Sequence, residues 1–119
     1  MAGNFNQNIL ARFYQDGTDV DTTNGDNFTI NRACSVYDVW AVAEANTAGN
    51  VQLFHTDDTA GNDITDNMAI NSDNTLTRTT QIADNKNAFT AGQVLCIKKS
   101  TQVTSSTFVL FNATGVTLS

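Results

Sequence analysis

The amino-acid sequence predicts an all-β fold: a small antiparallel β-sandwich or jelly-roll-like barrel of about seven or eight short strands. Asn and Thr together make up about a quarter of the residues, and they favour turns and strands respectively. Short apolar segments recur roughly every ten residues, with turn-forming residues between them. At 119 residues and with no linker, the chain 1–119 is expected to form a single domain, with residues 1–7 as a loose N-terminal arm.

Four strands are predicted in the N-terminal half, over residues 9–15, 27–32, 34–45 and 51–55. In the first, alternation places Leu10, Arg12 and Tyr14 on one face and the apolar residues between them on the other. The third segment, 34–45, also fits the pattern of a helix with one apolar side. A strand is favoured, since the turn NTAGN and the fourth strand would complete a hairpin. The expected faces of this third strand are Tyr37, Val39, Ala41 and Ala43 against Val36, Asp38, Trp40 and Val42.

The C-terminal half contains the two clearest strands, 94–100 and 107–113, which the turn TQVTSS would join into a hairpin. Residues 68–70 form a short strand, and the Thr-rich segment 75–83 is interpreted as an exposed or edge strand. With no proline in the chain, its sheet edges must be protected by charge, by bulges or by a partner subunit.

The chain is acidic, with 12 acidic and 6 basic residues and a net charge of -6. Such a surface repels phosphate backbones, so nucleic-acid binding is not expected. Lys98 and Lys99 must point to opposite faces of their strand, and the pair is interpreted as a solvated edge. The longest apolar run, VWAVA, is far short of the roughly 18 residues of a membrane helix, and no signal peptide is visible. We expect synthesis in a cytoplasm and no membrane partner.

The acidic stretch DGTDVDTTNGDN, residues 16–27, is the first candidate site. An EF-hand needs oxygen ligands at positions 1, 3 and 5, Gly at position 6 and Glu at position 12. Starting at Asp19 puts Asn24 at position 6 and Ile30 at position 12, and starting at Asp16 fails at position 5. The EF-hand is excluded. An irregular calcium site stays open, and a polar hairpin connection between the first two strands is favoured.

Candidates for catalysis are few. His55, the only histidine, lies in the segment HTDD with no second imidazole or cysteine beside it, and a surface histidine is favoured over a zinc ligand. Phosphate-binding glycine motifs and a nucleophile elbow are absent, although a Ser-His-Asp set from distant segments stays open. We expect no enzyme activity and no cofactor, and we assign no catalytic, cofactor-binding or metal residue.

The cysteines and aromatic residues have structural interpretations. Cys34 and Cys96 lie in apolar segments and are expected to be free thiols in the core, although a single disulfide stays open. The aromatic residues could form a platform for sugar stacking, but most are needed in the core. Phe108 and Phe111 point to opposite sides of one strand. Apolar residues on both sides of a strand favour a second face that a partner chain covers.

The segments AFTAGQVLCIKKS (88–100) and TFVLFNATG (107–115) resemble the small β-sandwich decoration, or cement, proteins of tailed-phage heads. The closest likeness is to the cement proteins of cyanobacterial phages. These segments cover about the C-terminal third of the chain. Over the rest, the chain is similar only in composition, being acidic, rich in Asn and Thr, and free of Pro.

The resemblance implies a non-enzymatic virion protein on the outer capsid surface, whose partners are the major capsid protein and, in a homotrimer, copies of itself. Candidate contact elements are the segment Phe5–Leu10, the strand 75–81 and the loops. The alternatives are a carbohydrate- or calcium-binding β-sandwich module, or another phage structural piece such as a tail or fibre domain.

Overall fold

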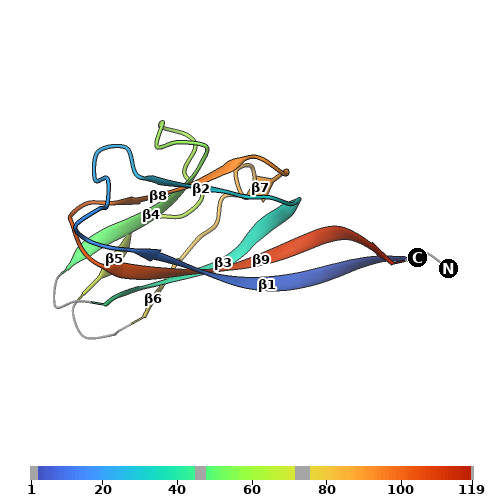
Figure 1. Cartoon of the computed structure of the whole chain (residues 1–119), viewed down its shortest axis with the longest axis horizontal. Helices are drawn as coiled ribbons and strands as arrows, with labels where there is room; N and C mark the ends of the chain where they lie inside the picture. The colour runs from blue at the N-terminus through green and yellow to red at the C-terminus, as the bar shows by residue number, and fades with distance from the viewer. Residues whose placement is uncertain (1–2, 45–47, 72–75, 119) are drawn as a thin grey trace.

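The computed structural model describes residues 3–44, 48–71 and 76–118, of which 3–6 and 114–118 by their backbone alone. Two antiparallel sheets pack face to face, as Figure 1 shows, and no helix occurs in these ranges. The strands are β1 (Gly3–Gln15), β2 (Asp26–Thr29), β3 (Cys34–Ala43), β4 (Gly49–His55), β5 (Met68–Ile70), β6 (Thr77–Arg78), β7 (Ala88–Phe89), β8 (Val94–Lys99) and β9 (Ser105–Leu118).

The strands pair in a nested order. The five-stranded sheet runs β1-β9-β3-β6, with β7 also paired to β3, and the four-stranded sheet runs β2-β8-β4-β5. Thus β1 pairs with β9, β2 with β8, β3 with β6, and β4 with β5. One long hairpin wound into two sheets gives this order, which is that of a jelly roll. The predicted class of small antiparallel sandwich is confirmed.

The three predicted hairpins are wrong, because the two strands of each one lie in opposite sheets. β1 is separated in this way from β2, β3 from β4, and β8 from β9. Each connection crosses the edge of the sandwich instead of reversing within one sheet. Gly, Asn and Asp residues correctly marked where the chain turns, but they carry no information about which strand it joins next.

A bulge in β3 changes part of its predicted faces. The register against β9 shifts between Val36 and Asp38, so Tyr37 and Asp38 both lie on the outer side of the sheet. Val36 therefore joins Val39 on the inner side, where both are buried, whereas Tyr37 is 63% exposed. The prediction that placed Tyr37 with Val39 is wrong for this reason.

Two predicted strands are shorter than expected. The strand expected at 27–32 is β2, which ends at Thr29, and the strand expected at 75–83 is only the two residues of β6. Residue 75 lies outside the described residues. Just after β6, the hydroxyls of Thr79 and Thr80 each donate to the Asp66 carboxylate at 2.7 Å. β6 lies at a sheet edge, as predicted.

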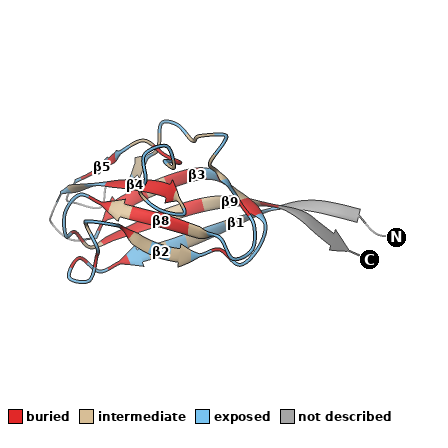
Figure 2. Cartoon of the chain, turned by 90° about the horizontal axis from the view of Figure 1, so that it is seen from above, coloured by how far each residue is buried: buried red, intermediate tan, exposed pale blue. Residues whose placement is uncertain are grey.

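The core lies between the two sheets, and Figure 2 shows buried residues concentrated in β3, β4 and β8. It includes the inward-facing residues Val39, Ala41, Val51, Leu53, Ile70, Leu95, Ile97 and Val109, all fully buried. Val and Ile suit strands that are packed on one face against another sheet.

β8 is a central strand, which corrects the prediction of a solvated edge at Lys98 and Lys99. Lys98 lies 2.7 Å from Asp58 in an ion pair. Lys99 is fully buried and donates to two backbone carbonyls and, at 3.0 Å, to the Ser105 hydroxyl. Burial lowers the pKa of Lys99 to about 8, because the charged form loses its hydration.

β1 begins at Gly3, before the predicted start at residue 9, and pairs with β9 as far as Leu118. The pairing of β3 with β9 ends at Asn112. Beyond that point β1 and β9 continue as a two-stranded ribbon that projects from the body, with Gly3 paired to Leu118 toward its tip (Figure 1). The molecule is correspondingly long, 52 × 28 × 25 Å.

Candidate functional site

The outer face of the five-stranded sheet carries a group of apolar side chains that no described part of the chain covers. They are Leu10, Trp40, Leu76, Phe108 and Leu110, and together they line a shallow depression. We call this set the apolar face. The pairing register places Leu10 opposite Leu110 and Phe108 opposite Trp40. Leu10 is 62% exposed and Leu76 56%, which is unusual for leucine side chains gathered on one surface.

Charged residues that balance one another surround the apolar face. Arg12 donates to both carboxylate oxygens of Glu44 at 3.0 Å, and Arg78 pairs with Asp38. The Arg78 guanidinium also lies 5.8 Å from the centre of the Trp40 ring, within range of a cation–π contact. An apolar centre with aromatic residues, arginines and a polar rim is the usual composition of a protein–protein interface.

The outcome for Phe108 and Phe111 agrees with the predicted alternation. Phe111 points into the core and is 5% exposed, whereas Phe108 lies on the apolar face and is only half-buried. The sequence therefore indicated that β9 has an apolar outer side. It did not show that Leu10, Trp40 and Leu76 lie beside Phe108, since that depends on the nested pairing of distant strands.

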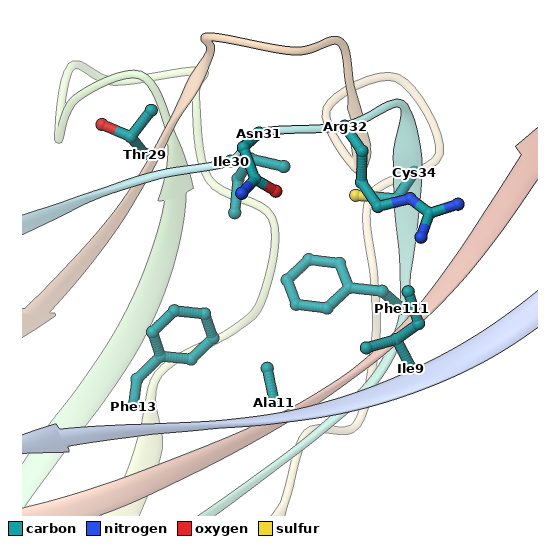
Figure 3. Close-up of a pocket in the computed structure, with 9 residues that line it drawn as sticks. All are labelled: Ile9, Ala11, Phe13, Thr29, Ile30, Asn31, Arg32, Cys34 and Phe111. Carbon is teal, nitrogen blue, oxygen red and sulfur yellow. The ribbon is translucent and has the colours of Figure 1, made fainter.

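A second feature is a pocket of about 210 Å³ in the seam between the two sheets (Figure 3). We call it the edge pocket. Its lining is Ile9, Ala11, Phe13, Thr29, Ile30, Asn31, Arg32, Cys34 and Phe111. The inward side of β1 forms one wall, and the segment from β2 to β3 forms the opposite wall. Most of this lining is apolar, and Arg32 supplies one exposed charge.

The carboxylates of the acidic stretch 16–27 stabilise their own loop. Asp16 accepts a hydrogen bond from the backbone N–H of Thr18 at 3.0 Å, and Asp21 accepts from the N–H groups of Asn24 and Thr23. These bonds lower the pKa of Asp21. Among the described residues, no three His, Cys, Asp or Glu side chains are grouped so that they could hold a metal ion. The loop joins β1 to β2 in the other sheet, so the predicted hairpin is wrong.

His55 is half-buried rather than simply a surface residue. Its Nε2 lies 2.9 Å from the carbonyl of Ala88 and its Nδ1 lies 2.9 Å from the hydroxyl of Thr56. The ring stacks on Phe89 with 4.4 Å between centroids. Since a carbonyl can only accept, Nε2 carries a proton in this arrangement. These contacts give His55 a structural role, in fixing β4 against β7.

Both cysteines are buried and unpaired, as predicted. Burial raises the pKa of Cys34, and burial together with the nearby Asp58 raises that of Cys96 to about 11. Both thiols therefore stay protonated at neutral pH and are poor nucleophiles. Cys96 lies under the acidic loop, where a Cβ on Gly25 would lie 2.6 Å from its sulfur.

The comparisons with known proteins give no family for this chain: no protein-family model matches it, and no curated protein matches it. Within the described residues, no helix is long and apolar enough to span a membrane. The candidate sites therefore stand on their geometry alone.

Proposed function

We propose that this chain is a structural virion protein that binds the outer surface of a phage head as a homotrimer and clamps neighbouring major-capsid subunits. The observation that supports it most is the uncovered apolar face, with Leu10 and Leu76 more than half exposed. The segment 107–115, which resembles the cement proteins of tailed phages, supplies Phe108 and Leu110 at the centre of this face.

In this proposal the apolar face joins copies of the chain to one another. The whole chain has a net charge of -6, so most of its surface repels a second copy. Around the apolar face, the charges of Arg12 and Arg78 are balanced by those of Glu44 and Asp38. The face is therefore a place where copies can meet without bringing like charges together.

A trimer would stabilise the shell through avidity. A trimer presents three capsid-binding surfaces in a fixed arrangement, so that binding of the second and third is intramolecular. A ligand that binds only the assembled shell shifts the equilibrium toward that shell. The projecting ribbon of β1 and β9 and the surface loops remain available for contacts with the capsid.

Two measurements test this proposal. Size-exclusion chromatography with light scattering should give three times the chain mass of 12.8 kDa, and Leu10→Asp should give the monomer because it places a charge in the apolar face. Ala69→Asp, on the exposed side of β5, is the matched control and should leave the trimer intact. The wild-type chain should also co-sediment with heads of the phage that encodes it. A monomer that does not bind those heads contradicts the proposal.

A further inference from the structure

β1 is the end strand of its sheet, and among the described residues no strand pairs with one of its edges. The Thr104 carbonyl accepts from Glu44, and the Val39 carbonyl accepts from Thr79. Backbone groups in an antiparallel sheet alternate in direction, so even-numbered residues of β9 bond to β3 and odd-numbered ones to β1. By the same alternation, the even-numbered residues of β1 from 8 to 14 direct their N–H and C=O groups toward the free edge.

From residue 8 to residue 14 this edge has little of the usual protection against strand pairing. Natural edge strands are kept short, carry charges or proline, or contain bulges, and the register shift of β1 between Phe5 and Gln7 lies outside this stretch. β1 is 13 residues long and contains neither lysine nor proline, and its single charged residue is Arg12. Its backbone groups are therefore available to another extended chain.

The edge pocket lies directly beside this free edge. Ile9, Ala11 and Phe13 point inward, yet they are partly exposed, whereas Val109 and Phe111 opposite them on β9 are buried. Any strand that paired with β1 would direct alternate side chains into the same seam. For comparison, an apolar cavity of about 150 Å³ holds a benzene molecule. The edge pocket, at about 210 Å³, has room for one aromatic or branched aliphatic side chain.

Charge indicates what kind of strand fits. Figure 3 shows the Arg32 guanidinium beside Cys34 at the end of the pocket near Ile9. No ion pair to Arg32 occurs among the described residues, so an occupant with a carboxylate would gain one. The β1 strand of a second copy contains no acidic residue, so it would leave Arg32 without a carboxylate. The charge therefore favours a different protein over a second copy.

We propose that β1 and the edge pocket form a strand-addition site for an extended segment of a partner protein, with one large apolar side chain in the pocket and a carboxylate two residues away at Arg32. In such sites, main-chain hydrogen bonds supply affinity and pockets for alternate side chains supply specificity. This inference does not depend on the virion assignment, because it uses only the free edge, the pocket and Arg32.

The test uses the full chain and a synthetic peptide, acetyl-Thr-Val-Thr-Phe-Thr-Asp-Thr-amide, labelled for fluorescence polarisation. Val, Phe and Asp share one face of this peptide when it is extended. We expect saturable binding with a dissociation constant below about 1 mM. Replacing Phe by Ala, or Asp by Lys, in the peptide should weaken binding about ten-fold, or about 1.4 kcal/mol.

Two variants of the protein separate the pocket from the edge. Ala11→Leu fills the pocket and should weaken binding about ten-fold while leaving the melting temperature equal or higher, because it occupies empty apolar space. Asn8→Pro removes an N–H from the free edge without touching a bond to β9, and it should also weaken binding. Ala69→Leu, the same change as in Ala11→Leu but on the exposed side of β5, should bind like the wild type.

Three outcomes would count against the proposal. Absence of saturable binding by the Phe peptide overturns it, as does equal binding by the Phe and Ala peptides, since the pocket then plays no part. If light scattering shows that Asn8→Pro dissolves an oligomer of the wild-type chain, the edge is occupied by a copy of this chain and the partner-protein assignment is wrong.

Discussion

The outer faces of the two sheets of the sandwich differ in whether the chain covers their apolar residues. On the four-stranded sheet, Phe54 and Cys96 point outward, opposite each other, yet both are buried outside the main core. The 16–25 loop covers Cys96, whose thiol donates to the Asn24 carbonyl, and Asp63 of the 56–63 loop pairs with Phe54. On the five-stranded sheet, Leu10 and Phe108 have no such loop above them in the described chain.

This difference teaches that the apolar face is not a necessary consequence of the fold. The same chain covers apolar residues on one sheet with its own Asp-rich loops and leaves those on the other sheet exposed. Where its own loops cover a face, the chain needs no other molecule to bury the apolar residues of that face. The uncovered apolar face on the other sheet is the feature on which the proposed contact between copies rests.

The largest expected effect compares Phe54 with Phe108 directly. Phe54→Ala should lower the free energy of unfolding by about 3 kcal/mol, because the ring is buried and its removal leaves a cavity. Phe108→Ala should lower it by less, about 1–2 kcal/mol in dilute monomeric samples, since part of that ring is already in water. Urea unfolding monitored by circular dichroism measures both. Equal losses would show that the two outer faces do not differ.

A second effect contrasts the two sides of β8 through its lysines. The pKa of Lys99 in the folded chain, about 8, lies below its value of 10.5 in the unfolded chain. Between these values the unfolded chain binds more protons at Lys99, so the contribution of Lys99 to stability should rise by roughly 1–3 kcal/mol from about pH 8 to about pH 10.5. Cys96, whose pKa is raised from 9.0 to about 11, acts in the opposite direction above about pH 9, so the rise is clearest between pH 8 and 9. Below pH 8 both states are protonated and the contribution is constant.

Matched substitutions identify which lysine is responsible. Lys99→Met should flatten the rise in stability, whereas Lys98→Met, on the exposed side of the same strand, should leave it unchanged. Urea unfolding at several pH values measures the slope. An unchanged slope in Lys99→Met would mean that another group titrates in this range.

The smallest expected effect concerns the rim of the apolar face. Glu44→Gln removes the charge that faces Arg12 but keeps an oxygen that can accept from the Ser106 hydroxyl. Because this ion pair is partly exposed, the loss in stability should be less than about 1 kcal/mol. It should also shrink at about 1 M salt, where screening is strong. A larger loss that does not depend on salt would show that this rim is more deeply buried than the structure indicates.

The sequence predicted where the strands lie better than it predicted which strands pair with one another. Alternation in ILARFYQ correctly placed Leu10, Arg12 and Tyr14 on one side, and the same reasoning separated Phe108 from Phe111. The sequence did not predict the strand pairing, because β1 pairs with β9 across almost the whole length of the chain. The bulge at Tyr37 and the buried position of Lys99 depend on that pairing, so no local pattern indicated them.

The candidate surfaces were only partly predictable for the same reason. Phe5–Leu10 and the strand 75–81 were expected to be contact elements, and Leu10 and Leu76 do lie on the apolar face. No sequence pattern predicted the edge pocket, because its two walls come from strands in different sheets. Arg32 and Ala11 become neighbours only once the sandwich has formed.

The nested pairing also determines when the sheets can form during synthesis. β9 is made after the other eight described strands, and it is also the strand between β1 and β3. On the ribosome, β1 and β3 lack their shared neighbour until β9 has emerged, and their apolar sides stay exposed during that time. Contacts between residues so distant in sequence make folding slow, so folding speed and protection from aggregation depend on the final strand.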